Sequence, residues 1–133
     1  MVILRNKKKE ILITKEYRHG ARKVIYGLPG GIIEKKDTPL QTIKRELYEE
    51  TGIIAKKWKF FHKFLRHCSY NCGVDHVYIA DFFDKKSILL NEIEELKWFS
   101  IKKVKKMIAD NLFINSGVGF SLSKYILAQN KIK

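Results

Sequence analysis

Residues 30–53 read GGIIEKKDTPLQTIKRELYEETGI, and this stretch carries the pattern that decides the fold. Asp37 and Thr38 are both suitable N-cap residues, and Pro39 suits the first turn of a helix. Gly52 is a suitable C-terminal stop, because glycine adopts the left-handed conformation that ends many helices. The stretch therefore predicts one helix that follows a glycine-containing loop.

Three glutamates are expected on one face of this helix. Glu46, Glu49 and Glu50 occur at positions i, i+3 and i+4, so their carboxylates project from the same side. They repel one another near the helix C-terminus, where the helix dipole adds to the cost. Arg45 can reach Glu49, but one guanidinium does not balance three carboxylates. Because Mg²⁺ takes oxygen ligands and joins carboxylates to phosphates, one interpretation is a Mg²⁺ site. The other is a surface helix whose charges are held by scattered lysines.

The hydrophobic pattern outside this stretch predicts strands on both sides of the helix and further helices after them. The strand-like runs are residues 2–4, 10–17, 23–28, 57–66, 74–83 and 96–99. One further helix is expected over residues 101–109, capped by Ser100, and another from Gly117 or Ser121 to about Gln129. This order predicts an α/β fold with a mixed sheet covered by helices. We expect a single domain over residues 1–133.

Composition excludes several classes of protein. The chain of 133 residues is 45% hydrophobic, has two cysteines and contains no apolar run of about 20 residues. These features argue against membrane, disulfide-rich secreted and fibrous proteins, and they predict a cytoplasmic protein without a membrane partner. The net charge is +13, but only five of the 27 basic residues are arginine and the lysines are spread along the chain. Such a spread is typical of a solvated face, although a positive field favours anionic substrates.

The decisive stretch resembles the Nudix box, G-x5-E-x7-R-E-U-x-E-E-x-G-U, in which U is an aliphatic residue. The matching positions are Gly31, Arg45, Glu46, Leu47, Glu49, Glu50, Gly52 and Ile53. At roughly one in fifteen per identity, chance agreement at the six polar and glycine positions is on the order of 10⁻⁷ per register. Asp37 stands where the pattern has Glu. The carboxylate is retained on a shorter arm, which predicts a tuned site rather than an inactive one.

The resemblance implies a fold, a reaction and roles for residues. Nudix proteins are α/β/α sandwiches with a mixed β-sheet, and they hydrolyse a diphosphate joined to another moiety. Glu46, Glu49 and Glu50 match the family's ligands for Mg²⁺ or Mn²⁺, and Gly30 matches the residue that offers a backbone carbonyl to the metal. Arg45 matches the arginine that orients a carboxylate. A carboxylate serves as general base in the family, and we expect Glu50 in that role, with Glu49 as the alternative.

Flanking segments resemble the ADP-ribose and ADP-sugar pyrophosphatase branch of the Nudix family. They are KEYR at residues 15–18, LPGG at residues 28–31, EELKWFS at residues 94–100 and NS at residues 115–116. In that branch the residue matching Arg18 helps to hold the nucleoside diphosphate, and Gly31 belongs to the loop whose backbone can approach the substrate. The resemblance therefore implies Mg²⁺-dependent hydrolysis of ADP-ribose or an ADP-sugar to AMP and a sugar phosphate.

Departures from that branch keep other functions open. The proline that the branch places beyond the box is replaced at His67 and Cys68, and residues 69–75 replace the loop that often supplies a glutamate base. Asp75 is a candidate substitute. The alternatives are hydrolysis of nucleoside triphosphates, including oxidised ones, action on capped RNA, which is not favoured, and a binding module without catalysis. The intact Arg45–Glu50 set favours an enzyme. A homodimer is a further option.

Metal-binding residue types also gather in the predicted loop between residues 66 and 74. His62, His67, Cys68, Cys72 and His76 fall within 15 residues. Zinc is one interpretation, but the Cys-x3-Cys spacing does not match the usual paired knuckles. We therefore expect reduced cysteines in a loop that rims the active site.

Overall fold

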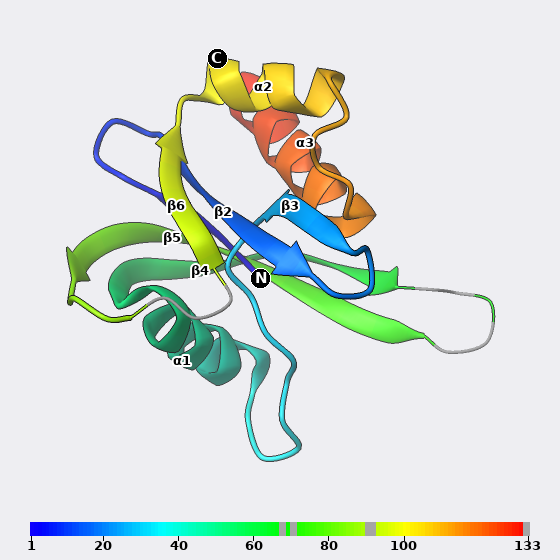
Figure 1. Ribbon diagram of the computed structural model, residues 1–133. Coiled ribbons are helices and arrows are strands. Elements are labelled where there is room, and N and C mark those ends of the chain that lie inside the picture. The colour runs from blue at the N-terminus through cyan, green and yellow to red at the C-terminus, as the bar shows by residue number, and fades with distance from the viewer. Residues whose placement is uncertain (67–68, 70–71, 90–92, 132–133) are drawn as a thin grey trace.

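The computed structural model of the chain describes residues 1–66, 69, 72–89 and 93–131 (Figure 1). Six strands and three helices occur in this part of the chain. Their order is β1 (Val2–Arg5), β2 (Ile11–Arg18), β3 (Lys23–Gly27), α1 (Pro39–Thr51), β4 (Ile53–Arg66), β5 (Gly73–Lys85), β6 (Ile93–Phe99), α2 (Ile101–Ala109) and α3 (Ser116–Asn130).

The strands form one mixed sheet, as the sequence predicted. The order along the main path is β3-β2-β1-β5-β4, and β6 pairs with β2. β1 and β5 are parallel, whereas the other paired strands are antiparallel. β1 lies in the middle of the path, which explains why its residues are apolar without alternation.

Helices cover both faces of the sheet (Figure 1). Val2 and Leu4 pack in the core under α1, whereas Ile3, which points to the opposite face, packs in the core under α2 and α3. This arrangement confirms the α/β/α sandwich. In the part of the chain described here, no helix combines the length and apolar character needed to cross a membrane.

Both ends of α1 are fixed by the residues that the sequence singled out. The Thr38 side chain accepts a hydrogen bond from the Gln41 amide at 3.2 Å, and the Gln41 side chain accepts one from the Thr38 amide at 2.9 Å. At the other end, Gly52 has φ 71° and donates its N–H to the Tyr48 carbonyl at 2.8 Å. The helix therefore presents its glutamates at a fixed distance from both caps.

The strands are longer than the hydrophobic pattern predicted. β4 begins at residue 53 rather than 57, and β6 begins at residue 93 rather than 96. Pairing of β4 with β5 continues across register shifts after Ile54 and Lys56, and Lys57 has a positive φ of 54°. These bulges place lysines where an alternating pattern would require apolar residues, so the pattern hides the first turn of the ladder.

α3 begins at Ser116, earlier than either start that the sequence suggested. The reason is the cap, because the Asn115 side-chain oxygen accepts hydrogen bonds from the amides of Gly117 and Val118 at 3.0 and 3.4 Å. The cap, rather than the apolar stripe, sets the start of the helix.

His62 is buried between β4 and α3 and is held in the neutral form. Its Nε2 lies 3.2 Å from Oγ of Ser121, and that hydroxyl donates its hydrogen to the Gly117 carbonyl at 2.7 Å. The imidazole therefore has to donate from Nε2, and Nδ1 has no partner among the described residues. Burial, followed by the charge of Lys124, lowers the pKa of His62.

We expect His62 to make the stability of the chain depend on pH. Because its pKa is lower in the folded than in the unfolded chain, its contribution is complete above the ordinary value of about 6.5 and is lost as the pH falls below that value. Urea unfolding at pH 7.5 and pH 5.5 measures the effect. His62→Gln keeps a donor towards Ser121 but does not titrate, so the variant should lose less stability than the wild type on acidification. Equal losses would contradict the assignment.

Candidate active site

The loop from β3 to α1 lies directly against the glutamate face of the helix. A Cβ added to Gly31 would be 2.4 Å from Cδ and 2.8 Å from Oε2 of Glu46. The Glu46 carboxyl group therefore occupies the space that any other residue at position 31 would fill. This close approach explains why the pattern in the sequence requires glycine here.

The three glutamates lie in different environments. Glu46 and Glu50 are half-buried, whereas Glu49 is exposed. Burial, with the negative charges of Glu46 and Glu16, raises the pKa of Glu50 to about 7, and a backbone hydrogen bond from Gly30 acts in the opposite direction. Burial and the charge of Glu49 also raise the pKa of Glu46. Negative charge has therefore accumulated on this face beyond what the neighbouring cations balance.

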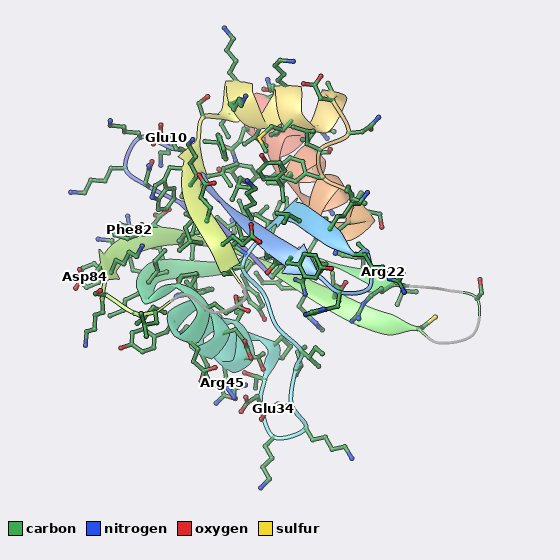
Figure 2. The ribbon with its side chains drawn as sticks, in the orientation of Figure 1. Glu10, Arg22, Glu34, Arg45, Phe82 and Asp84 are labelled. Atoms are coloured by element: carbon green, nitrogen blue, oxygen red, sulfur yellow. The ribbon has the colours of Figure 1, made fainter. Side chains whose placement is uncertain are left out.

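Arg45 pairs with the loop rather than with the glutamates. Its guanidinium Nη2 lies 2.8 Å from a carboxylate oxygen of Asp37, and Nη1 lies 3.6 Å from Glu34. Figure 2 shows Glu34 on the loop and Arg45 on α1 near each other. No ion pair joins Arg45 to Glu49 within residues 1–66, because helical side chains lean towards the helix N-terminus. Asp37, which stands where the Nudix pattern has Glu, thus ties the loop to the helix.

The donor set on this face suits a hard divalent cation. All of the candidate side-chain ligands are carboxylates, and the repulsion between Glu46 and Glu50 would be relieved by a cation. Among the residues that the structure describes, no three carboxylate, imidazole or thiol side chains converge to form a complete metal site. Mg²⁺ usually takes only one or two carboxylates and completes its shell with water and substrate phosphates. The residues present therefore fit Mg²⁺ better than a metal that needs a full protein cage.

A cavity of about 410 Å³ opens beside the glycine loop. Its walls come from β2, β3, the loop, the start of α1, the facing ends of β4 and β5, and the start of α3. Arg18 lines it, and Nη2 of Arg18 lies 2.5 Å from the Glu16 carboxylate. Gly30 and Gly31 line the same cavity. The structure thus brings the predicted substrate-binding residues together, beside the glutamate face of α1.

Two charged residues of the cavity come from the β4–β5 hairpin. Arg66 and Asp75 both line the cavity and form an ion pair of 2.9 Å. Asp75 had been named as a candidate from the sequence, but Arg66 had not. Nothing in the sequence distinguishes Arg66 from any other arginine at the end of a strand, since its position depends on cross-strand pairing.

The histidine and cysteine residues do not form one cluster in the described part of the chain. His62 is buried against α3, His76 lines the cavity and Cys72 is exposed. His67 and Cys68 lie outside the described residues. This separation among the three described members agrees with the expectation that the segment is not a zinc site.

Comparisons with known proteins agree with these features. Residues 1–114 match the NUDIX domain family. The chain is 27% identical over 103 residues to ADP-ribose pyrophosphatase of Bacillus subtilis (strain 168), covering 74% of this chain and 56% of that protein. It is 43% identical over 63 residues to 8-oxo-dGTP diphosphatase of Escherichia coli (strain K12), covering 46% of this chain and 47% of that protein. The matched regions thus span about half the length of these curated relatives.

A solved structure shares the fold. A NUDIX hydrolase from Nitrosomonas europaea superposes with a TM-score of 0.78 at 17% sequence identity, covering 96% of this chain and 87% of that chain. At this identity the likeness concerns the fold alone. The family match, however, extends over most of the chain and includes the loop, the helix and the glutamates described above. The chain belongs to the NUDIX domain family.

Proposed function

We propose that this chain is a Mg²⁺-dependent pyrophosphatase that cleaves a nucleoside diphosphate joined to another moiety, with ADP-ribose or an ADP-sugar as substrate. The products would be AMP and a sugar phosphate. The observation that carries the proposal is the cavity in which Arg18 and the Gly30–Gly31 loop meet beside the glutamate face of α1. The similarity to the ADP-ribose pyrophosphatase of B. subtilis supports the choice of substrate.

Each residue of the proposed site has a separate task. The Glu46, Glu49 and Glu50 carboxylates and the Gly30 carbonyl would hold Mg²⁺, with Mn²⁺ as an alternative. When bound, the cation neutralises the diphosphate and polarises its phosphorus–oxygen bonds. Arg18 would donate charge-assisted hydrogen bonds to the diphosphate, and its pairing with Glu16 fixes its orientation.

Glu50 would act as the general base, and Glu49 is the alternative. Water attacks one phosphorus atom, its proton passes to the carboxylate, and the bridging P–O bond breaks so that the second phosphate leaves. Arg45 acts indirectly, because its contact with Asp37 holds the glycine loop on the helix. Its role is to position the loop rather than to touch the reacting atoms.

A second candidate function is hydrolysis of an oxidised nucleoside triphosphate. The similarity to the 8-oxo-dGTP diphosphatase of E. coli supports it over 63 residues. A binding module without turnover is the third alternative, although the chain retains all the glutamates of the pattern. Action on RNA, a homodimer, a cytoplasmic location and a single domain over residues 1–133 stay predictions.

Arg18→Gln tests the proposed function. On a panel of ADP-ribose, an ADP-hexose, a dinucleoside polyphosphate, dGTP, 8-oxo-dGTP and 5′-triphosphate RNA, the wild type should release AMP from ADP-ribose fastest. The variant should lose about tenfold or more in kcat/KM for ADP-ribose, because a charged hydrogen bond to phosphate is removed.

Arg22→Gln is the matched control, because it removes the same charge from an exposed residue that does not line the cavity (Figure 2). It should retain the wild-type kcat/KM. Turnover confined to triphosphates would reject the ADP-sugar assignment, and no turnover on any substrate would favour the binding module.

A further inference from the structure

The guanidinium of Arg66 lies flat against a glycine on the neighbouring strand. Arg66 ends β4 and is paired in register with Gly73, which begins β5. A Cβ added to Gly73 would be 2.9 Å from Nη2, 3.1 Å from Cζ and 3.3 Å from Nε of Arg66. Because three atoms of one planar group lie at nearly the same distance, the face of the guanidinium covers the space that a side chain would fill.

Asp75 fixes the edge of the same guanidinium. Its Oδ1 lies 2.9 Å from Nη2 of Arg66, and it lies two residues after Gly73, on the same face of β5. One face of the guanidinium thus rests on Gly73 and one edge is held by a carboxylate. This fixation reduces the rotational freedom that a long side chain otherwise loses when it binds a ligand.

The remaining surface of Arg66 is available to the cavity. The side chain is 53% exposed and lines the cavity of about 410 Å³ together with the apolar residues Ile25 and Val118. Arg18, the proposed ligand of the diphosphate, comes from a different strand of the same cavity wall. The cavity therefore offers one arginine on β2 and a flat, oriented arginine at the β4–β5 end.

We propose that Arg66 is a stacking platform for the nucleobase of the substrate, an inference that rests on the proposed function and adds a specificity residue to it. A planar, delocalised guanidinium stacks well on aromatic rings. A second phosphate fits less well, because Asp75 already neutralises Arg66 and would repel an anion at that edge. A neutral planar base meets the open face without approaching the carboxylate.

Two variants disturb the platform in different ways. Arg66→Lys keeps the positive charge and removes the plane. Gly73→Ala leaves Arg66 in the sequence but displaces the far end of its flexible side chain, so the fold should persist. Gly20→Ala is the matched control, because a Cβ there meets no heavy atom within 4 Å.

The experiment is calorimetric titration of each variant with AMP, with GMP and with ribose 5-phosphate, which has no base. Both platform variants should bind AMP or GMP about tenfold more weakly than the wild type, whereas ribose 5-phosphate should bind within about twofold. Gly20→Ala should match the wild type with every ligand. Circular dichroism checks that each variant is folded.

Three results would overturn the proposal. They are equal weakening of nucleotide and ribose 5-phosphate binding, unchanged nucleotide binding in both variants, and a wild type that binds neither nucleotide more tightly than ribose 5-phosphate. Because binding of AMP needs no turnover, a loss of base-dependent binding would support the platform even if ADP-ribose proved not to be hydrolysed. Failure of the platform is thus distinguishable from failure of the proposed function.

Discussion

Replacing Glu50 with glutamine is expected to reduce turnover of ADP-ribose by a factor on the order of 10² or more, with the fold retained. Glutamine has nearly the same shape, but it cannot accept the proton of water and carries no charge for a cation. Measured kcat with saturating Mg²⁺ tests the prediction. Glu94→Gln makes the same chemical change at an exposed position of β6 and should keep wild-type turnover.

The same substitution should not destabilise the metal-free chain at alkaline pH. Burial raises the pKa of Glu50 to about 7, above its ordinary value of 4.5, so ionisation is unfavourable in the folded state. The wild type should therefore lose stability as the pH rises through this interval, whereas Glu50→Gln should not. Near-wild-type turnover in the variant would show that the assignment of the site is wrong.

Replacing Gly52 with alanine is expected to lower the free energy of unfolding by about 2–4 kcal/mol. Gly52 has φ 71°, a left-handed conformation that is costly for alanine. A Cβ at this position would also lie 2.2 Å from the carbonyl oxygen of Lys86, which is backbone and cannot move without shifting the chain after β5. Lys86 additionally donates its amide to the Gly52 carbonyl at 2.9 Å, so the contact joins two elements.

Urea unfolding of Gly52→Ala measures this loss, with Gly20→Ala as the control at a glycine that has open space around it. The control should unfold within about 0.5 kcal/mol of the wild type. If the two alanine variants were equally stable, the left-handed cap at Gly52 would not be the constraint that the structure indicates.

The sequence was most informative where local chemistry decides the structure. Thr38 and Gly52 cap α1 as predicted, and Ser100 caps a helix over Ile101–Ala109 with the bounds that the sequence suggested. Caps act within one turn of the residue that forms them, so they can be recognised without knowledge of the fold. The glutamates follow from the same helix, because their spacing alone places them on one face.

Contacts between distant residues could not be predicted from the sequence. Arg66 reaches the cavity only because β4 and β5 pair in one register, and that register contains bulges that no local pattern reveals. The partner of Arg45 was likewise unexpected, since the reach to Glu49 was evident from helical spacing whereas Asp37 lies in a loop. The pairing of distant strands and the path of a loop depend on the whole fold.

The most direct test of the proposed function is the release of AMP from ADP-ribose by the wild type, measured in Mg²⁺, in excess chelator, and in Mg²⁺ with the Glu50→Gln variant. The account predicts AMP formation in Mg²⁺ that stops in chelator and falls at least a hundredfold in the variant. AMP formation that is unaffected by chelator or by the substitution would contradict it, as would the absence of AMP under all three conditions.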